Sequence, residues 1–214
     1  MAAPSSSEAE RQRDKDRTRA DILDVATREF ADKGYTGARV DEIAERTSTT
    51  KRMIYYYFGG KEQLYVAVLE RAYSAIRALE AELDVEHLEP EDAIRELAEL
   101  TFDHHEANPD FIRLVSIENI HHAEHIARSE ILAGLANPVL DGLTRVLARG
   151  REAGRFRADV DALDVHQVIS SFCVFRLANR HTFAAIFGRD MLDPARREHH
   201  RRMLGDLLIN YLTA

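Results

Sequence analysis

A short stretch near residue 50 combines basic and phenolic side chains at the spacing of a helix. At about 100° per residue, one arc of such a helix carries two cations and two phenols, Lys51, Arg52, Tyr55 and Tyr56. The opposite arc carries Ile54, Tyr57 and Phe58. Arginine and lysine pair with guanine edges or phosphates, and tyrosine hydroxyls reach phosphate oxygens. The pattern favours a helix that packs by one face and reads nucleic acid by the other, although an exposed helix whose tyrosines only cover a core fits the same residues.

A second set of residues has the spacing of metal ligands. Glu118, His121, His122 and His125 lie within about 100° of arc if the segment is one helix. Such a set suits a transition metal, but imidazoles on a helix also face water or bond to one another, and no HExxH arrangement is present. We expect no cofactor. The metal interpretation, a metal-dependent helical-bundle enzyme or a metal-responsive regulator, is kept as the alternative.

Composition excludes several classes of protein. The single cysteine, Cys173, lies in an apolar run, which excludes a disulfide framework and predicts a buried thiol in a reducing compartment. The first residues lack a basic stretch followed by an apolar one, and no later segment approaches the ~20 apolar residues of a membrane span. We therefore expect a cytoplasmic protein.

The net charge of −8 is distributed unevenly. Residues 1–60 hold 11 basic and 11 acidic residues, so all of the net negative charge falls in 61–214. Between residues 46 and 61 the charged residues are all basic, namely Arg46, Lys51, Arg52 and Lys61. An acidic protein can therefore still present a basic patch to phosphates.

Helical periodicity runs through most of the chain and predicts an all-α fold. Residues 1–16 are polar and aperiodic, which indicates a mobile arm. Three short helices follow, over about 18–34, 40–44 and 50–58, too close together to bury their apolar faces except against one another, so 17–60 should form a trihelical unit. From residue 61 to 214 the pattern predicts a second helical domain, with helices over 61–83, 90–107, about 161–187 and 194–213.

Two runs resemble a known family. Residues 50–69, TKRMIYYYFGGKEQLYVAVL, and residues 30–44, FADKGYTGARVDEIA, are similar in order and spacing to the helix-turn-helix of the tetracycline-repressor (TetR) family. The likeness covers about 18–69 continuously. Further on, residues 150–157, GREAGRFR, resemble a turn that precedes the two final helices of the family, which usually form its dimer.

The resemblance implies a set of DNA-contacting residues. The positions that face the groove fall on Thr49, Thr50, Lys51, Arg52 and Tyr55, with Tyr56 adjacent, while Lys61 takes a phosphate-clamping position and Arg39 a phosphate-contacting cap. Two departures are evident: Ser48 replaces the usual turn glycine, and Arg52 replaces a small residue. Arg52 should change the preferred bases, so the operator of a relative does not transfer.

The resemblance also implies a sensor. In this family the later helices enclose an inducer pocket, and an inducer must bind the conformer that does not bind DNA more tightly than the one that does. Apolar candidates to line the pocket are Phe102, Phe111, Leu114, Phe172 and Phe175. Polar candidates are His105, His121, His122 and Arg176, the last pairing with an anionic inducer or with a partner-chain carboxylate.

These observations predict a repressor that binds a near-palindromic operator as a homodimer and is released by a small-molecule inducer. Proposed members of a four-helix dimer interface are Ile169, Phe172, Leu204, Leu208 and Tyr211. Two hypotheses remain beside this one: the metal-dependent protein described above, and an architectural DNA binder without a sensor.

Overall fold

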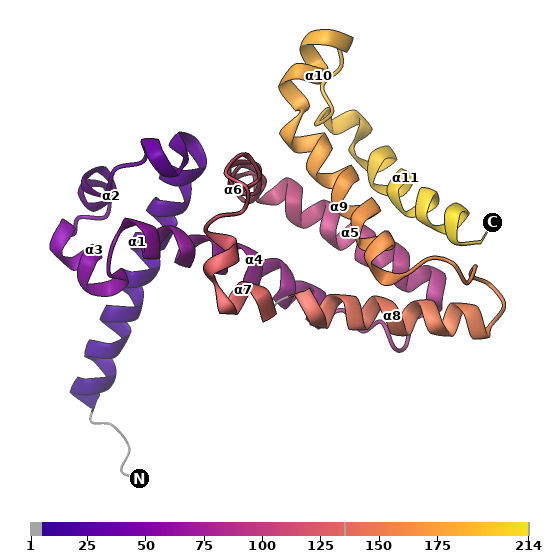
Figure 1. Ribbon diagram of the computed structural model, residues 1–214, viewed down its shortest axis with the longest axis horizontal. Helices are drawn as coiled ribbons and strands as arrows, with labels where there is room; N and C mark the ends of the chain where they lie inside the picture. The colour runs from indigo at the N-terminus through magenta and orange to yellow at the C-terminus, as the bar shows by residue number, and fades with distance from the viewer. Residues whose placement is uncertain (1–5, 135, 214) are drawn as a thin grey trace. The chain divides into compact units, whose positions relative to one another are not determined.

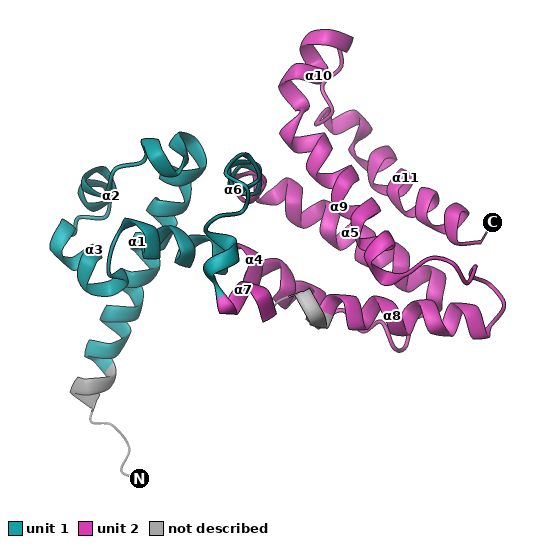
Figure 2. Cartoon of the chain, in the orientation of Figure 1, with its two compact units in different colours: residues 1–71, 113–129 teal, residues 72–112, 130–214 magenta. Residues whose placement is uncertain are grey.

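The computed structural model describes residues 6–134 and 136–213, with side chains over 10–134 and 139–213. Within this part the chain is helical and contains no strand (Figure 1). The all-α expectation is confirmed. The helices form two compact units, which Figure 2 distinguishes by colour: residues up to Arg71 with Arg113–Ser129, and Ala72–Ile112 with Glu130 onward.

The first unit contains the three predicted short helices. They are α1 (Ser6–Gly37), α2 (Val40–Arg46) and α3 (Lys51–Phe58), followed by α4 (Lys61–Glu82) as far as Arg71. Their apolar faces meet as the periodicity predicts, because neither α2 nor α3 is long enough to be stable alone. The buried residues of this core include Ile22, Phe30, Ile43, Ile54, Phe58 and Leu64.

The first helix is longer than expected at its N-terminal end. The sequence predicts a mobile arm over 1–16, whereas α1 begins at Ser6; residues 1–5 lie outside the described residues. Apolar periodicity fails there because residues 10–17 are exposed and have no core to face. Arginine, lysine, glutamate and glutamine nevertheless have high helix propensity, and Gln12 donates to Asp16 at 2.9 Å one turn later.

The first unit also includes residues far along the chain. Most of α6 (Pro109–Ile120) and the short 3₁₀ helix η1 (Ile126–Arg128) belong to it. The sequence-based boundary at residue 60 therefore differs from the observed division, in which α4 and α6 each contribute to both units. Contacts between distant segments decide this division, and periodicity does not record them.

The second unit is a helical bundle built around α5. Its helices are the rest of α4, α5 (Pro90–Ala107), α7 (Glu130–Gly134), α8 (Ala136–Glu152), α9 (Ala162–Ala178), α10 (Arg180–Phe187) and α11 (Pro194–Leu212). Helix α5 packs against α8, α9 and α11, and α8 also packs against α9. The predicted 161–187 segment is thus two helices, separated at Asn179.

A tight turn joins α8 to the segment before α9. Gly150 lies against the ring of Phe156, where an added Cβ would stand 2.1 Å from a ring carbon. Only glycine fits this close approach. The turn closes with Gly154 at a φ of 66°, and the buried Phe156 ring joins the core of the second unit.

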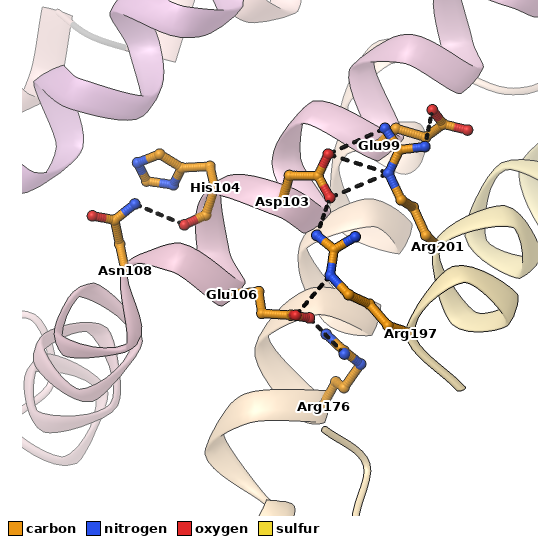
Figure 3. Close-up of polar contacts among 8 residues, drawn as sticks. All are labelled: Glu99, Asp103, His104, Glu106, Asn108, Arg176, Arg197 and Arg201. Carbon is orange, nitrogen blue, oxygen red and sulfur yellow. Dashed lines mark hydrogen bonds and ion pairs between the residues drawn. The ribbon is translucent and has the colours of Figure 1, made fainter. Parts of the chain in front are cut away.

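Ion pairs join α5 to α9 and α11 (Figure 3). Asp103 accepts from Arg197 at 2.7 Å, and from Arg201. Glu106 pairs with Arg197 at 2.8 Å and with Arg176 at 2.6 Å. These charges fix the relative rotation of three helices whose apolar contacts alone are non-directional.

One stretch, Glu130–Glu152, is long and apolar enough to cross a membrane by length and composition alone. The stretch is only weakly apolar and is not a clear membrane span. The described parts of the stretch are α7 and α8, and Leu143, Val146 and Leu147 of α8 are buried in the core of the second unit. Buried core helices of this kind meet the same criterion.

Candidate nucleic-acid interface and ligand region

The turn into α3 shapes the candidate nucleic-acid interface. Ser48 adopts a φ of 50°, so the chain reverses there without the usual glycine. Thr50 is the N-cap, and its side chain accepts from the backbone N–H of Met53 at 3.2 Å. Gly59, with a φ of 87°, ends the helix. The helix therefore begins and ends where the cap and glycine signals predict.

The two faces of α3 have the burial that the spacing predicts. Ile54 and Phe58 are buried, and Tyr57 is half-buried. Tyr55 and Tyr56 are 45% and 68% exposed. Thr50, Lys51 and Arg52 are also exposed, and Thr49 is half-buried. The exposed face thus carries hydroxyl and cationic groups together.

The cations around α3 differ in how far their charges are already paired. Lys51 lies 3.1 Å from Asp41, which also faces Arg39 at 3.9 Å. Lys61 donates to the carbonyl of Thr36 at 3.3 Å and lies over the ring of Tyr35, and partial burial lowers its pKa. Arg52 has no ion-pair partner among the described side chains. Its five donors therefore keep their full capacity for an external acceptor.

A buried carboxylate organises the segment that follows α6. Glu118 accepts from the backbone N–H groups of His125 and Ile126, each at 3.2 Å, and its Oε1 lies 3.0 Å from His125 Nδ1. The His125 ring packs 4.4 Å from the ring of Tyr35 and 4.8 Å from that of Tyr65. Sequence reasoning missed this role. The packing of the His125 ring on Tyr35 and Tyr65 ties the segment after α6 to α1 and α4 within the first unit.

The proposed metal set does not assemble. Helix α6 ends at Ile120, and His122 and Ala123 both adopt a φ of 58°, so 118–125 is not one helix. His121 and His122 are exposed, whereas Glu118 and His125 are buried and bonded to each other. Over residues 6–134 and 136–213 no group of three or more potential metal ligands occurs.

A histidine cluster lies in the second unit. His104 and His105 of α5 are buried, with ring centroids 5.6 Å apart, and both rings pack edge-on against Phe111. Burial lowers the pKa of His105 to about 4 and also lowers the pKa of His104. Half-buried His166 of α9 belongs to the same neighbourhood, because its charge affects the pKa of His105.

A cavity of about 620 Å³ lies among α9, α10 and α11. Phe172, Phe175 and Arg176 line it, together with Phe183, Met191 and Met203. The charge of Arg176 is already paired: the side chain donates to the carbonyl of Met191 at 3.0 Å, pairs with Glu106 and lies 4.2 Å from the ring centroid of Phe102. It therefore lacks the free charge that the sequence interpretation gave it.

Two family models match the chain. Residues 22–68 match the bacterial regulatory proteins of the tetR family, and residues 90–208 match the tetracyclin repressor-like C-terminal domain. The second model alone covers more than half of the chain. This chain belongs to the TetR family. The resemblance read from residues 18–69 is confirmed.

Relatives match most of the chain. The HTH-type transcriptional repressor NicS of Pseudomonas putida is 34% identical over 197 residues, 92% of this chain and 93% of NicS. The repressor SCO4008 of Streptomyces coelicolor is 34% identical over 62% of this chain and 68% of its own. The crystal structure of the transcriptional regulator SCO4942, also from Streptomyces coelicolor, has a TM-score of 0.66 at 32% identity, covering 89% of this chain and 97% of that one.

Membership of the TetR family makes the protein a DNA-binding transcriptional regulator and not an enzyme. The first unit therefore contains the helix-turn-helix. The ligand candidates fall into separate groups: His105 and Phe111 meet in the histidine cluster, and Phe172, Phe175 and Arg176 meet at the cavity. Phe102 lies in the core, while Leu114, His121 and His122 belong to the first unit.

Proposed function

We propose that this TetR-family regulator is a cytoplasmic repressor that binds a near-palindromic operator as a homodimer and is released by a small-molecule inducer. The observation that carries the proposal is the exposed face of α3, where Lys51, Arg52, Tyr55 and Tyr56 stand opposite buried Ile54 and Phe58. A helix presented in this way suits the major groove. The N-terminus of α3, capped by Thr50, adds backbone donors for a phosphate.

A homodimer follows from the limited reach of one such helix, which covers too few base edges for the specific affinity of a repressor. The exposed apolar residues of α9 and α11 supply a surface for the second copy: Leu163, Val168, Phe175, Leu207 and Tyr211. Three of the interface residues expected from the sequence are misassigned, because Ile169, Leu204 and Leu208 are at most 1% exposed within the core. Phe172 and Tyr211 remain in the proposed interface.

The cavity among α9, α10 and α11 continues this surface, since Val168 and Phe175 line it. We assign it to the partner copy. Its apolar lining is what an obligate interface buries, and Arg176, one of the two arginines that line it, is paired with Glu106. Phe172, Phe175 and Arg176 thereby move from the ligand set to the dimer surface.

Selection of bound duplexes from random DNA tests the proposal. We expect enrichment of a near-palindrome with half-sites read from one face of the DNA, about one helical turn or somewhat more apart. Binding should weaken steeply with salt. Binding indifferent to sequence would instead support an architectural role, and a monomer on an asymmetric site would contradict the dimer.

Elemental analysis of untagged protein tests the metal-responsive alternative. The exposure of His121 and His122, together with the engagement of Glu118 by His125 and Ile126, argues against first-row metal ligation. One transition-metal ion per chain, lost in a His121→Ala and His125→Ala double variant, would restore that alternative.

A further inference from the structure

The histidine cluster, defined as His104, His105 and His166, holds nitrogen atoms that no protein atom satisfies. The Nδ1 atoms of His104 and His105 are buried and have no hydrogen-bond partner of good geometry among the described residues, and only the Thr101 backbone approaches His105. The two side chains are 7% and 6% exposed. A buried polar atom without a partner costs about 1–3 kcal/mol. Two in adjacent residues are therefore unusual unless a ligand completes them.

Helix α5 separates this cluster from the charge network described above. Figure 3 shows His104 on the opposite side of α5 from Asp103, whose carboxylate is bonded to Arg197 and Arg201. The carboxylates of that network are therefore occupied elsewhere. The Asn108 side chain donates to the backbone carbonyl of His104 at 2.8 Å and makes no hydrogen bond to the His104 ring.

The charged and titratable groups that face the cluster come from α4 and α9. Burial is the main cause that lowers the pKa of each of the three histidines, and the charge of Arg77 on α4 lowers it further. Arg77 pairs with Glu80, and burial raises the pKa of Glu80 to about 7. His166 Nδ1 lies 3.4 Å from the hydroxyl of Ser170. The backbone of Thr101, one turn earlier on α5, approaches His105 and raises its pKa against the larger effect of burial.

Three neutral imidazoles beside one arginine make a set that is complementary to an anion. A negative charge among them would favour the protonated form of an imidazole, which then donates to it. Arg77 is already paired with Glu80, so it offers no free positive charge to a ligand. One proton taken up by a histidine supplies one positive charge. The set therefore suits a monoanion better than a phosphate.

We propose that the histidine cluster binds the inducer through a carboxylate, and that a histidine of the cluster takes up one proton from the solvent as it binds. This inference rests on the proposed function, since it names the ligand class of the sensor. The carboxylate would accept hydrogen bonds from the imidazole nitrogens that lack a partner. The proton comes from the buffer, so no other reactant is required.

Three matched pairs of probes test the charge requirement: acetate and acetamide, benzoate and benzamide, phenylacetate and phenylacetamide. Calorimetric titrations of the full-length protein in buffers of different ionisation enthalpy measure proton uptake. We expect at least one acid to bind about tenfold or more tightly than its amide, with up to one proton gained per chain and affinity rising as pH falls from 8 to 6. Equal affinity of acid and amide, no proton uptake, or no saturable binding of any acid would overturn the proposal.

Variants locate the site. His104→Gln and His105→Gln should each lower the affinity for the tightest acid about tenfold or more and reduce proton uptake, whereas His181→Gln should match the parent because His181 is exposed on α10. Unchanged binding in both cluster variants would contradict the site. Should either variant fail to fold, the proton uptake of the parent and the ring signals of its histidines in NMR titrations still decide the question.

Operator binding separates this inference from the proposed function. If the protein binds its selected operator and an uncharged compound alone releases it, the ligand class is wrong and the repressor proposal stands. If carboxylates bind with proton uptake but no specific operator can be selected, the repressor proposal is wrong and the site stands.

Discussion

Single residues on α3 differ in how much bonding capacity they leave for DNA. Lys51 shares Asp41 with Arg39, whereas Arg52 has no ion-pair partner among the described residues. Ammonium groups meet phosphates as point charges, and a guanidinium recognises guanine through two parallel bonds. We therefore assign general affinity to Lys51 and base preference to Arg52.

Substitution separates these two roles. Lys51→Ala should lower affinity for all operator variants alike and flatten the dependence of affinity on salt. Arg52→Ala should relax specificity at one base position in each half-site, at a cost of about 1–3 kcal/mol if the contact to guanine is bidentate. Titrations against single-base operator variants at several salt concentrations measure both effects.

Arg202→Ala is the matched control for these variants. Arg202 is an exposed arginine of α11 in the second unit, with Glu198 at 3.8 Å. Its removal should leave DNA affinity and specificity unchanged. Parent-like binding by both α3 variants would mean that α3 does not read the operator.

At the scale of elements, the turn after α6 depends on one carboxylate. Glu118 is 1% exposed and accepts from two backbone N–H groups and from the His125 ring. Two successive residues, His122 and Ala123, hold positive φ values in this turn, which costs free energy that neighbouring contacts must offset. Glu118 supplies those contacts.

Removal of this carboxylate should therefore be costly. Glu118→Ala leaves buried donors of the turn unpaired and should lower the free energy of unfolding by at least about 2 kcal/mol. Glu124→Ala is the control: Glu124 pairs with Arg128 on the surface, so its loss should cost less than about 1 kcal/mol. Denaturant unfolding compares the two variants, and equal small losses would show that the turn does not depend on Glu118.

Local signals explain why α2, α3 and α5 could be predicted closely. Thr50 caps α3, Gly59 ends it and Pro90 begins α5, and each of these residues acts through its own backbone. The break at Asn179 and the turn around His122 carry no comparable signal. The sequence therefore predicted one helix over about 161–187, and it considered 118–125 as one helix only as the condition for the metal set.

The candidate sites also differed in how far local sequence signals could predict them. Opposite faces of α3 differ in polarity, so spacing alone indicated which side chains are exposed. Helices α9 and α11 have apolar residues on both faces, such as Ile169 and Phe175 on α9, and the sequence does not indicate which face packs inward. The misassigned interface residues follow from this ambiguity.

At the scale of the whole molecule, assembly depends on the outward faces of α9 and α11. Phe175→Glu places a charge on a side chain that is 50% exposed, so the protomer should fold while the dimer dissociates. Light scattering at micromolar concentration should report a monomer and DNA titrations a loss of operator affinity. Ile131→Glu, which changes a side chain of α7 that is 57% exposed and lies outside the proposed interface, should remain a dimer. A dimeric Phe175→Glu variant would place the interface elsewhere.

Stability against pH is the other property of the whole molecule, and two buried groups affect it in opposite directions. The pKa of His105 falls from its ordinary value of 6.5 to about 4 on folding, so the unfolded chain binds more protons and stability is lost as pH falls from 6.5 to 4. The pKa of Glu80 rises from 4.5 to about 7, so stability is lost as pH rises from 4.5 to 7. Over the shared range the two contributions largely cancel, although each is on the order of 3 kcal/mol.

Variants should reveal how each of the two groups makes stability depend on pH. As pH falls from 6.5 to 4, His105→Gln should gain stability relative to the parent, because it no longer has an imidazole that is protonated only on unfolding. As pH rises from 4.5 to 7, Glu80→Gln should gain relative to the parent for the converse reason. Denaturant unfolding at half-unit pH steps measures both differences, with exposed His181→Gln as the control that should run parallel to the parent. Curves for His105→Gln that also run parallel would show that His105 titrates normally in the folded protein, and would remove the electrostatic support for anion binding at the histidine cluster.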